Sequence, residues 1–187
     1  MTRIELWNGD ICDLEVDAIV NAANLSLWMS TGLAGEIKRA GGDAIEFAAV
    51  RQAPVEIGDA IVTPAGRLAA RVVIHAVSLD RDRRTNAEII DRAVRSAMAR
   101  ARELKVTSIA FPAMGTGVGG FPLDESARVT VNAVRDELAD SPSIAFVTFA
   151  MRGAATYQAF ESAVAGVSSR AVDASGPVST ADGTVHA

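Results

Sequence analysis

Apolar residues along the chain occur in two kinds of run, short β-branched runs and longer segments with helical spacing. Short apolar runs bounded by glycine, proline or charged residues are typical of strands. Two of them, Gly58–Thr63 and Arg71–Val77, flank the turn residues Pro64-Ala65-Gly66 and are expected to pair. The other predicted strands are residues 3–7, Val16–Val20, Val106–Phe111 and Ile144–Phe149.

Helical periodicity fills most of the chain between these runs. Gly41-Gly42 separates the first two predicted helices, and Thr85 with Glu88 three residues later resembles a capping box that begins the third. Strands that alternate with helices predict an α/β fold, in which ligands bind beyond the carboxyl ends of the strands. The predicted helices cover residues 33–40, 43–51, 85–104, 122–138 and 156–164.

Length and composition fit one such domain followed by a tail. The chain has 187 residues, of which 49% are hydrophobic and only 5% aromatic, as expected for a sheet packed by alanine- and valine-rich helices. After about Gly166 the sequence is small, polar and without periodicity. We therefore predict one domain over residues 1–166 and a disordered tail over residues 167–187.

The charge balance narrows the classes of ligand and partner. A formal net charge of −5 and a pI of about 5.0 argue against a dedicated nucleic-acid binder, because such proteins neutralise phosphates with clustered lysine and arginine. An acidic protein that binds a phosphorylated ligand must rely more on oriented backbone dipoles than on cationic side chains. We therefore look for a phosphate site in the backbone.

Cysteine and histidine are too sparse to predict a metal site. Cys12 is the only cysteine, and the two histidines, His75 and His186, are far apart in the sequence. We expect no metal and no cofactor, and interpret His75 as a packing or locally hydrogen-bonded residue of its strand. The chain has no N-terminal signal pattern and no apolar run of ~18 residues, so we expect a cytoplasmic protein without membrane association.

Two glycine-containing loops carry the strongest chemical signal in the sequence. One covers Asn21–Gly35 and the other Pro112–Pro122, and each follows a predicted strand and precedes a predicted helix. Glycine lets the backbone approach a ligand closely and adopt positive φ, and a helix N-terminus presents free N–H groups to an anion. Together the loops predict a bed of N–H groups that holds phosphate.

The second loop also contains the spacing G-x-G-x-x-G, at Gly115, Gly117 and Gly120, which is the fingerprint of dinucleotide-binding Rossmann folds. That fingerprint opens the first βαβ unit and is followed by an acidic residue at the end of the next strand, about 20 residues on. Here the loop lies in the second half of the chain, and Asp136 and Glu137 fall within a predicted helix. We therefore disfavour a Rossmann-type site.

Four motifs in register resemble the macro domain family. They are Gly9-Asp10-Ile11, Val16–Asn24, Gly32–Gly35 and Gly115–Val118, and the likeness covers roughly Thr2–Ala165. The resemblance implies a three-layer αβα sandwich with a mixed, mostly parallel central sheet. It also implies a cleft across the strand ends that binds ADP-ribose or a derivative, with the two glycine loops as its walls.

For the adenine end of such a ligand, the resemblance implies three contact residues. Asp10 would accept a hydrogen bond from the adenine amino group, and the Ile11 N–H would lie beside the base. A carboxylate at this position also disfavours guanine, which has a carbonyl there. Phe149 matches an aromatic that stacks on adenine. The alternatives are that Asp10 only caps the following turn and that Phe149 only packs in the core.

For the phosphates and the distal ribose, which is the sugar that carries the attachment carbon, the resemblance implies contacts from both loops. Asn24 would bind the distal ribose, because an amide offers both a donor and an acceptor to adjacent hydroxyls. Asn21 would brace the loop by bonding to its backbone. The N–H groups around the phosphates would come from Gly32, Leu33 and Ala34 on one side and from Gly115, Thr116, Gly117, Val118 and Gly119 on the other.

Two departures from the family pattern leave the activity open. Ala34 stands where several members that remove ADP-ribose from proteins have an aspartate. Gly119 stands where many have an aromatic beside the distal ribose, and Trp28 or Met29 is the candidate to fill that space. The main prediction is binding of ADP-ribose or of an ADP-ribosylated protein. The alternative is a hydrolase of groups ester-linked to the distal ribose (an ADP-ribosyl-protein, O-acetyl-ADP-ribose or ADP-ribose 1″-phosphate), with Asn24 as the catalytic candidate that positions a water.

Overall fold

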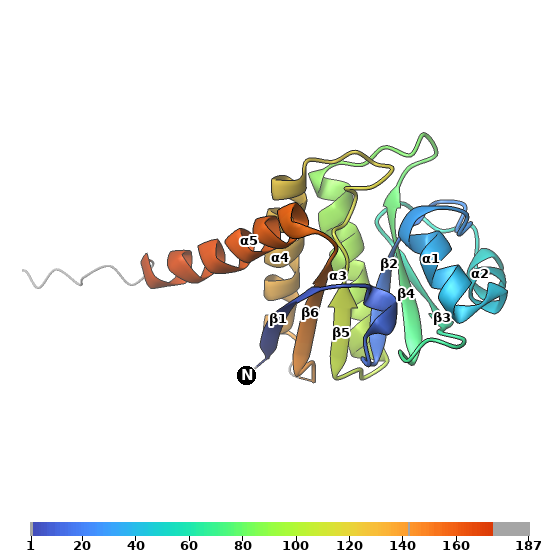
Figure 1. Ribbon diagram of the computed structural model, residues 1–187, viewed down its shortest axis with the longest axis horizontal. Helices are drawn as coiled ribbons and strands as arrows, with labels where there is room; N and C mark the ends of the chain where they lie inside the picture. The colour runs from blue at the N-terminus through green and yellow to red at the C-terminus, as the bar shows by residue number, and fades with distance from the viewer. Residues whose placement is uncertain (1, 142, 174–187) are drawn as a thin grey trace, which may run out of the picture.

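The computed structural model describes residues 2–141 and 143–173, which form one six-stranded sheet with helices on both faces (Figure 1). The strands are β1 (Arg3–Asn8), β2 (Ala18–Asn24), β3 (Ala60–Pro64), β4 (Val72–Leu79), β5 (Ser108–Phe111) and β6 (Phe146–Met151). The helices are α1 (Gly32–Gly41), α2 (Asp43–Val50), α3 (Ala87–Glu103), α4 (Leu123–Ala139) and α5 (Ala154–Asp173), and a short 3-10 helix, η1 (Ile11–Asp13), follows β1. Each strand and helix expected from the periodicity is present.

The sheet has the strand order β1-β6-β5-β2-β4-β3. All neighbouring strands are parallel except β3, which pairs antiparallel with β4 at one edge. The predicted pairing of the runs at 58–63 and 71–77 is thus confirmed, as is the mixed, mostly parallel sheet. Because parallel strands point the same way, the carboxyl ends of β2, β4, β5 and β6 meet at one edge of the sheet.

Helices cover the two faces of the sheet in separate layers, with α1 and α2 on one side and α3, α4 and α5 on the other (Figure 1). Successive strand residues point to opposite faces. In β6, Phe149 packs in the cluster under α3 to α5, whereas Ala150 packs in the cluster on the α1 side. Burying one side chain the size of Phe149 contributes roughly 1.5–3 kcal/mol. The three-layer αβα sandwich is confirmed.

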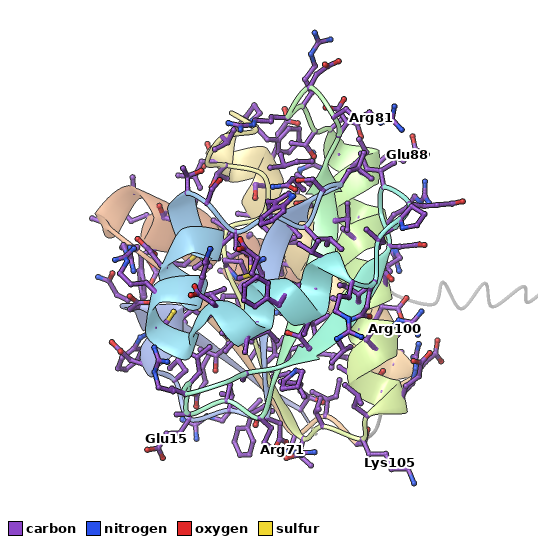
Figure 2. The ribbon with its side chains drawn as sticks, turned by 90° about the vertical axis from the view of Figure 1, so that its right-hand side faces the viewer. Glu15, Arg71, Arg81, Glu88, Arg100 and Lys105 are labelled. Atoms are coloured by element: carbon purple, nitrogen blue, oxygen red, sulfur yellow. The ribbon has the colours of Figure 1, made fainter. Side chains whose placement is uncertain are left out.

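Asp17 ties the amino ends of three strands together, at the edge of the sheet opposite the glycine loops. Its Oδ2 accepts hydrogen bonds from the N–H and hydroxyl of Thr107, at 2.7 and 2.8 Å, and from the Ser108 N–H at 3.2 Å. Its Oδ1 pairs with Arg71, at 3.0 Å. Burial raises the pKa of Asp17, but the hydrogen bonds from Thr107, Arg71 and Ser108 outweigh burial and lower the pKa to about 2. Arg71 and the loop containing Arg81 lie at opposite ends of the molecule (Figure 2).

His75 lies in the middle of β4, fully buried, as the sequence interpretation expects. Its Nδ1 accepts a hydrogen bond from the Asn21 side-chain amide at 3.1 Å, and its Nε2 bonds to the Thr63 hydroxyl at 2.9 Å. The three residues form a polar chain across β2, β4 and β3. Asn21 is therefore a structural residue, but it braces the sheet through His75 rather than the loop backbone, so that part of the prediction is wrong.

Several element boundaries differ from the prediction, among them those of β2, α3 and α5. β2 continues to Asn24, because parallel pairing with β4 overrides the local preference of asparagine for loops. The capping box at Thr85 is wrong, since Asn86 caps α3 with a side-chain oxygen that accepts an N–H of the first turn at 2.9 Å. α5 extends to Asp173, so the helix includes the first residues of the predicted tail. The rest of that prediction, residues 174–187, lies outside the described residues.

Stability should fall as the pH is lowered from about 6.5 to 4, because burial lowers the pKa of His75 to about 4. In this range the unfolded chain binds a proton that the folded chain does not, which destabilises the fold by about 3 kcal/mol at its lower end. Urea unfolding between pH 4 and 7 measures the effect. His75→Gln should flatten the slope in this range, whatever it does to stability at pH 7. A slope that persists unchanged in His75→Gln would show that other groups cause it.

Candidate functional site

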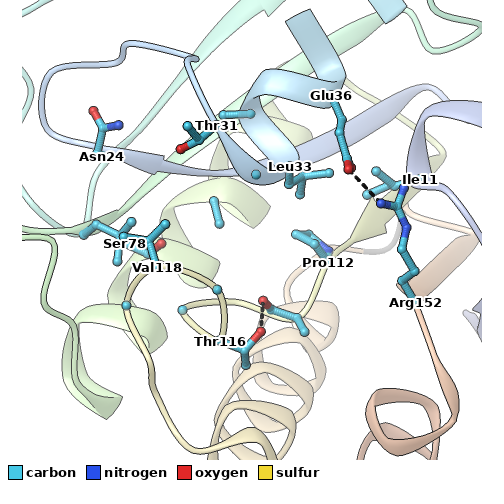
Figure 3. A pocket seen from close by; sticks show the side chains of 18 of the residues that line it. Ile11, Asn24, Thr31, Leu33, Glu36, Ser78, Pro112, Thr116, Val118 and Arg152 are labelled. Carbon is cyan, nitrogen blue, oxygen red and sulfur yellow. Dashed lines mark hydrogen bonds and ion pairs between the residues drawn. The ribbon is translucent and has the colours of Figure 1, made fainter. Parts of the chain in front are cut away.

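A pocket of about 400 Å³ lies at the carboxyl ends of the parallel strands, between the two glycine loops (Figure 3). In the close view, Thr31 and Leu33 of the first loop lie on one side of the pocket and Thr116 and Val118 of the second loop on the other. A volume of this order suits a small organic ligand. Of the residues predicted to contact a ligand, those that line the pocket are Ile11, Asn24, Gly32, Leu33, Ala34, Gly115, Thr116, Gly117, Val118 and Gly119.

The first wall is the N-terminus of α1. Thr31 precedes the helix in an extended conformation and makes no side-chain capping bond, and the first intrahelical N–H bond runs from Gly35 to the Thr31 carbonyl at 3.2 Å. The N–H groups of Gly32, Leu33 and Ala34 therefore have no acceptor in the described part of the chain. Gly32 has φ +59°, a conformation that favours glycine. These free N–H groups and the helix dipole favour an anion here.

A buried carboxylate holds the loop before this helix. Glu46 on α2 has a side chain that is 3% exposed, and its Oε2 accepts the Met29 N–H at 2.6 Å. Its Oε1 pairs with Lys38 of α1, also at 2.6 Å. Burial by itself raises the pKa of Glu46, but the hydrogen bonds from Lys38 and Met29 outweigh burial and bring the pKa below its usual value. The group is therefore ionised near neutral pH. Glu46 thus fixes the loop against both helices.

The second wall is the loop between β5 and α4. The Phe121 N–H bonds to the Gly115 carbonyl at 3.0 Å and the Gly120 N–H to the Gly117 carbonyl at 3.1 Å, which closes the loop into two turns. Gly115 and Gly120 have φ of +74° and +59°. Inside the outer turn, which runs from Gly115 to Phe121, the N–H groups of Thr116, Gly117, Val118 and Gly119 have no partner among the residues the structure describes. The two walls together supply the predicted bed of free N–H groups.

One end of the pocket is built around Arg152, which follows β6. Its guanidinium bonds to Glu36 at 2.8 Å and to Asp10 at 2.7 Å. Asp10 itself does not line the pocket, although Gly9 and Ile11 do. The carboxylate of Asp10 also accepts the Cys12 N–H at 2.9 Å and so caps η1. Burial raises the pKa of Asp10, but the bonds from Cys12 and Arg152 lower it below its usual value.

The other end contains Asn24, whose amide holds the loop that follows it. Its Oδ1 accepts the N–H and hydroxyl of Ser26, at 3.0 and 2.7 Å, and its Nδ2 donates to the Trp28 carbonyl at 3.1 Å. One amide hydrogen therefore remains for a ligand, whereas both oxygen lone pairs are used. Of the two residues expected to replace the missing aromatic, Trp28 lines the pocket and is 53% exposed, while Met29 is buried.

Phe149 is the one predicted contact that the structure places on the wrong side of the sheet. It is fully buried, with its ring centroid 5.4 Å from that of Phe160 and 6.3 Å from that of Phe111. Its neighbour Ala150 lines the pocket instead. The sequence position is right to within one residue, but in a strand one residue reverses the direction of the side chain. Stacking of Phe149 on adenine is therefore excluded.

Several residues of the site were not predicted from the sequence. Glu36, Glu46 and Arg152 come from α1, α2 and the segment after β6, and only the fold brings them to the pocket or its supporting loop. A carboxylate among the apolar residues of α2 was a local signal for Glu46. Ser78 and Arg83, from the end of β4 and the loop after it, also line the pocket. Nothing in its local sequence marked Ser78 as a site residue.

Neither a metal centre nor a membrane-spanning helix is found in residues 2–141 and 143–173. Within these ranges, no group of three or more His, Cys, Asp or Glu side chains is close enough to hold a metal ion. None of the helices there is both long and apolar enough to cross a membrane.

Replacing Glu46 with alanine should loosen the first wall. The change leaves the buried Met29 N–H without an acceptor, which costs about 2 kcal/mol of unfolding free energy. Amide hydrogen exchange from Met29 to Ala34 should become faster, and denaturant unfolding measures the loss of stability. Glu56→Ala removes an exposed carboxylate for which no side-chain bond is found in the described ranges, and is the matched control. Equal exchange rates in both variants would contradict the role of Glu46.

Comparisons with known proteins agree with this architecture. A sequence model of the Macro domain family matches residues 20–130. An uncharacterized protein of Mycobacterium tuberculosis is 42% identical over 88% of this chain, and the chain spans 45% of that relative's length. An O-acetyl-ADP-ribose deacetylase of Salmonella gallinarum is 42% identical over 72% of this chain and 79% of its own.

Solved structures show the same fold. A mutant macrodomain of Oceanobacillus iheyensis with ADPR is 25% identical and superimposes with a TM-score of 0.83 over 90% of this chain and 95% of its own. A Trypanosoma brucei macrodomain in complex with ADP-ribose is 28% identical, with a TM-score of 0.80 over 86% of this chain and 68% of its own. The αβα architecture, the two glycine loops and the match of more than half of the chain to the family model lead to one conclusion: this protein belongs to the Macro domain family.

Proposed function

We propose that the pocket binds ADP-ribose or a derivative of it. The observation that carries the proposal is that two sets of free backbone N–H groups, from Gly32 to Ala34 and from Thr116 to Gly119, line one pocket at the strand ends. Two facing sets of donors suit a diphosphate better than a single anion. Relatives of the same fold were crystallised with ADP-ribose, which supports this choice.

We place adenine at the Arg152 end. Asp10 does not line the pocket itself, but it adjoins Gly9 and Ile11 and bonds to Arg152, which do. Its carboxylate has about four acceptor positions, of which Cys12 and Arg152 occupy two, so an adenine amino group that reaches it can still be accepted. Ile11, the next residue in the chain, lines the pocket, and we propose that its backbone N–H lies beside the base. Since Phe149 is in the core, the exposed side of Arg152 is the available planar group at this end for stacking on the base.

The distal ribose then falls at the Asn24 end. The free amide hydrogen of Asn24 can donate to a ribose hydroxyl, and the indole of Trp28 supplies the aromatic surface that Gly119 cannot. Trp28 and Val118 are 53% and 55% exposed, so this end opens to solvent. An ADP-ribose attached to a protein could enter with its attachment point outward, and we propose ADP-ribosylated proteins as partners. The acidic charge of the chain gives no support to nucleic acid.

ADP-ribose should bind, and Gly117→Glu should abolish binding by adding a carboxylate to the phosphate bed. A Cβ at Gly117 would meet no heavy atom within 4 Å, so the fold should tolerate the change. Isothermal titration calorimetry measures the affinity, and circular dichroism confirms the fold. Gly166→Glu adds the same charge to α5, where a Cβ also meets no heavy atom within 4 Å, and should bind like the wild type. Normal titration of Gly117→Glu would remove the phosphate assignment.

A second titration tests the adenine end by itself. GDP-ribose should bind at least tenfold more weakly than ADP-ribose, since its carbonyl would face the Asp10 carboxylate. Asp10→Asn should narrow this difference, because an amide can donate to a carbonyl. Equal affinities of the wild type for the two nucleotides would remove Asp10 from this role.

The similarity to proteins named O-acetyl-ADP-ribose deacetylase favours a second candidate, hydrolysis of an ester at the distal ribose. The methyl side chain of Ala34 offers no hydrogen-bond acceptor for an attacking water. Hydrolysis would therefore depend on Asn24 and on the loop N–H groups, which can stabilise developing negative charge. Chromatography of O-acetyl-ADP-ribose and of a glutamate-linked ADP-ribosylated protein after incubation would reveal turnover. We expect any turnover to be lost in Asn24→Ala. No release from either substrate would leave binding alone as the function.

A further inference from the structure

The charges that line the pocket are unevenly paired. Arg152 at the adenine end is bonded to two carboxylates, Asp10 and Glu36, at 2.7 and 2.8 Å. Arg83, which comes from the loop between β4 and α3, also lines the pocket. Within the described residues, its guanidinium has no carboxylate partner and no hydrogen bond. The pocket thus holds one guanidinium that is neutralised and one that is free.

The loop that carries Arg83 is closed by hydrogen bonds around Asp80. Its side-chain Oδ1 accepts the N–H groups of Asp82 and Arg84, both at 2.8 Å. Its backbone carbonyl accepts the Arg83 N–H at 3.1 Å, and its N–H bonds to the Arg84 carbonyl at 3.0 Å. These bonds hold Arg83 at φ +59°, a conformation that a residue other than glycine rarely adopts. The loop therefore fixes the backbone position of Arg83, at a cost in backbone strain.

A second, independent feature lies just before this loop, at the Asn24 end of the pocket, where Leu79 of β4 pairs with Asn24 of β2. Ser78, at the end of β4, lines the pocket, is fully buried, and its Oγ has no hydrogen-bond partner in the described part of the chain. Figure 3 shows Ser78 near Val118 and on the Asn24 side, away from Arg152. Buried hydroxyls are almost always paired, so an unpaired one in a pocket wall indicates a place for a ligand or water oxygen. A free cation and an unpaired donor thus come from neighbouring parts of the chain.

We propose that Arg83 is a specificity-determining residue, which selects ADP-ribose derivatives that carry a negatively charged group at or beside the distal ribose. This inference rests on the proposed function. A guanidinium binds planar or tetrahedral oxyanions through paired N–H donors, and a neutral acyl group offers it far less. The anion can come from two sources, a phosphate ester on the distal ribose or a carboxylate of the polypeptide that carries the ADP-ribose.

The test compares charged with uncharged ligands of the full chain by calorimetry. We expect ADP-ribose 1″-phosphate, or an ADP-ribosylated peptide with glutamate beside the modified residue, to bind about fivefold to tenfold more tightly than ADP-ribose, or than the peptide with glutamine there. The gain should shrink as the salt concentration rises, because the group is exposed. Chromatography at the end of each titration checks that the ligand is intact.

Three variants separate a direct contact from a general charge effect. Arg83→Gln should remove the gain, measured as the ratio of the two affinities within that variant, whatever it does to the affinity for ADP-ribose itself, and Arg83→Lys should restore part of the gain. Arg81→Gln makes the same charge change on the same loop, but Arg81 lies at the outer surface and does not line the pocket, so the gain should remain (Figure 2).

The two charged ligands, the phosphate ester and the glutamate-containing peptide, also identify the source of the anion. A gain with the phosphate alone, with the peptide alone or with both supports the inference and names the ligand. The inference is wrong, and the proposed function stands, in two cases. In the first, ADP-ribose binds but neither charged ligand binds more tightly than its uncharged counterpart. In the second, the difference in affinity persists in Arg83→Gln. If ADP-ribose does not bind at all, the proposed function fails and this inference fails with it.

Discussion

The site depends on the alignment of parallel strands, and Asp17 fixes that alignment at the amino ends. One carboxylate accepts hydrogen bonds from the start of β5 and pairs with Arg71 just before β4, while Asp17 itself precedes β2. The amino ends of β2, β4 and β5 are thus bonded to the same carboxylate. Since each strand rises by a fixed length per residue, their far ends are also set relative to one another. The two loops can therefore form one pocket although about 80 residues separate them in the sequence.

The pocket is polar mainly through its backbone. An acidic chain would repel a diphosphate if side-chain charge decided binding, and Arg152, at the end where we propose adenine, is already paired with Asp10 and Glu36. The free N–H groups of both loops supply the positive potential instead. They are held in place by bonds elsewhere, from Met29 to Glu46 in the first loop and between the glycines in the second. Hydrogen bonds within the protein thus already hold both walls in place, and a preorganised site lowers the entropic cost of binding.

Much of the fold followed from the pattern of apolar residues, because each strand and helix is long enough to show its period. The boundaries were less accurate where tertiary contacts compete with local preference. Asn21 is an example: its sequence context suggests a loop, but its amide bonds to His75 in the next strand, and β2 extends through it. Phe149 is another, since β6 continues two residues beyond it to Met151, and the face that its side chain occupies depends on the register of the sheet.

The sequence by itself determined the family, the layered architecture and the two glycine loops, since motif spacing and glycine conformation are local properties. Only the tertiary structure decided which charged side chains pair with one another. Arg152, Glu36 and Asp10 come from three separate elements, and Glu46 reaches the first loop from the following helix. The tertiary structure also decided that Arg83 lines the pocket, because the hydrogen bonds around Asp80 hold the backbone of its loop there. Pairing of distant charges depends on three-dimensional distances, which no local pattern in the sequence encodes.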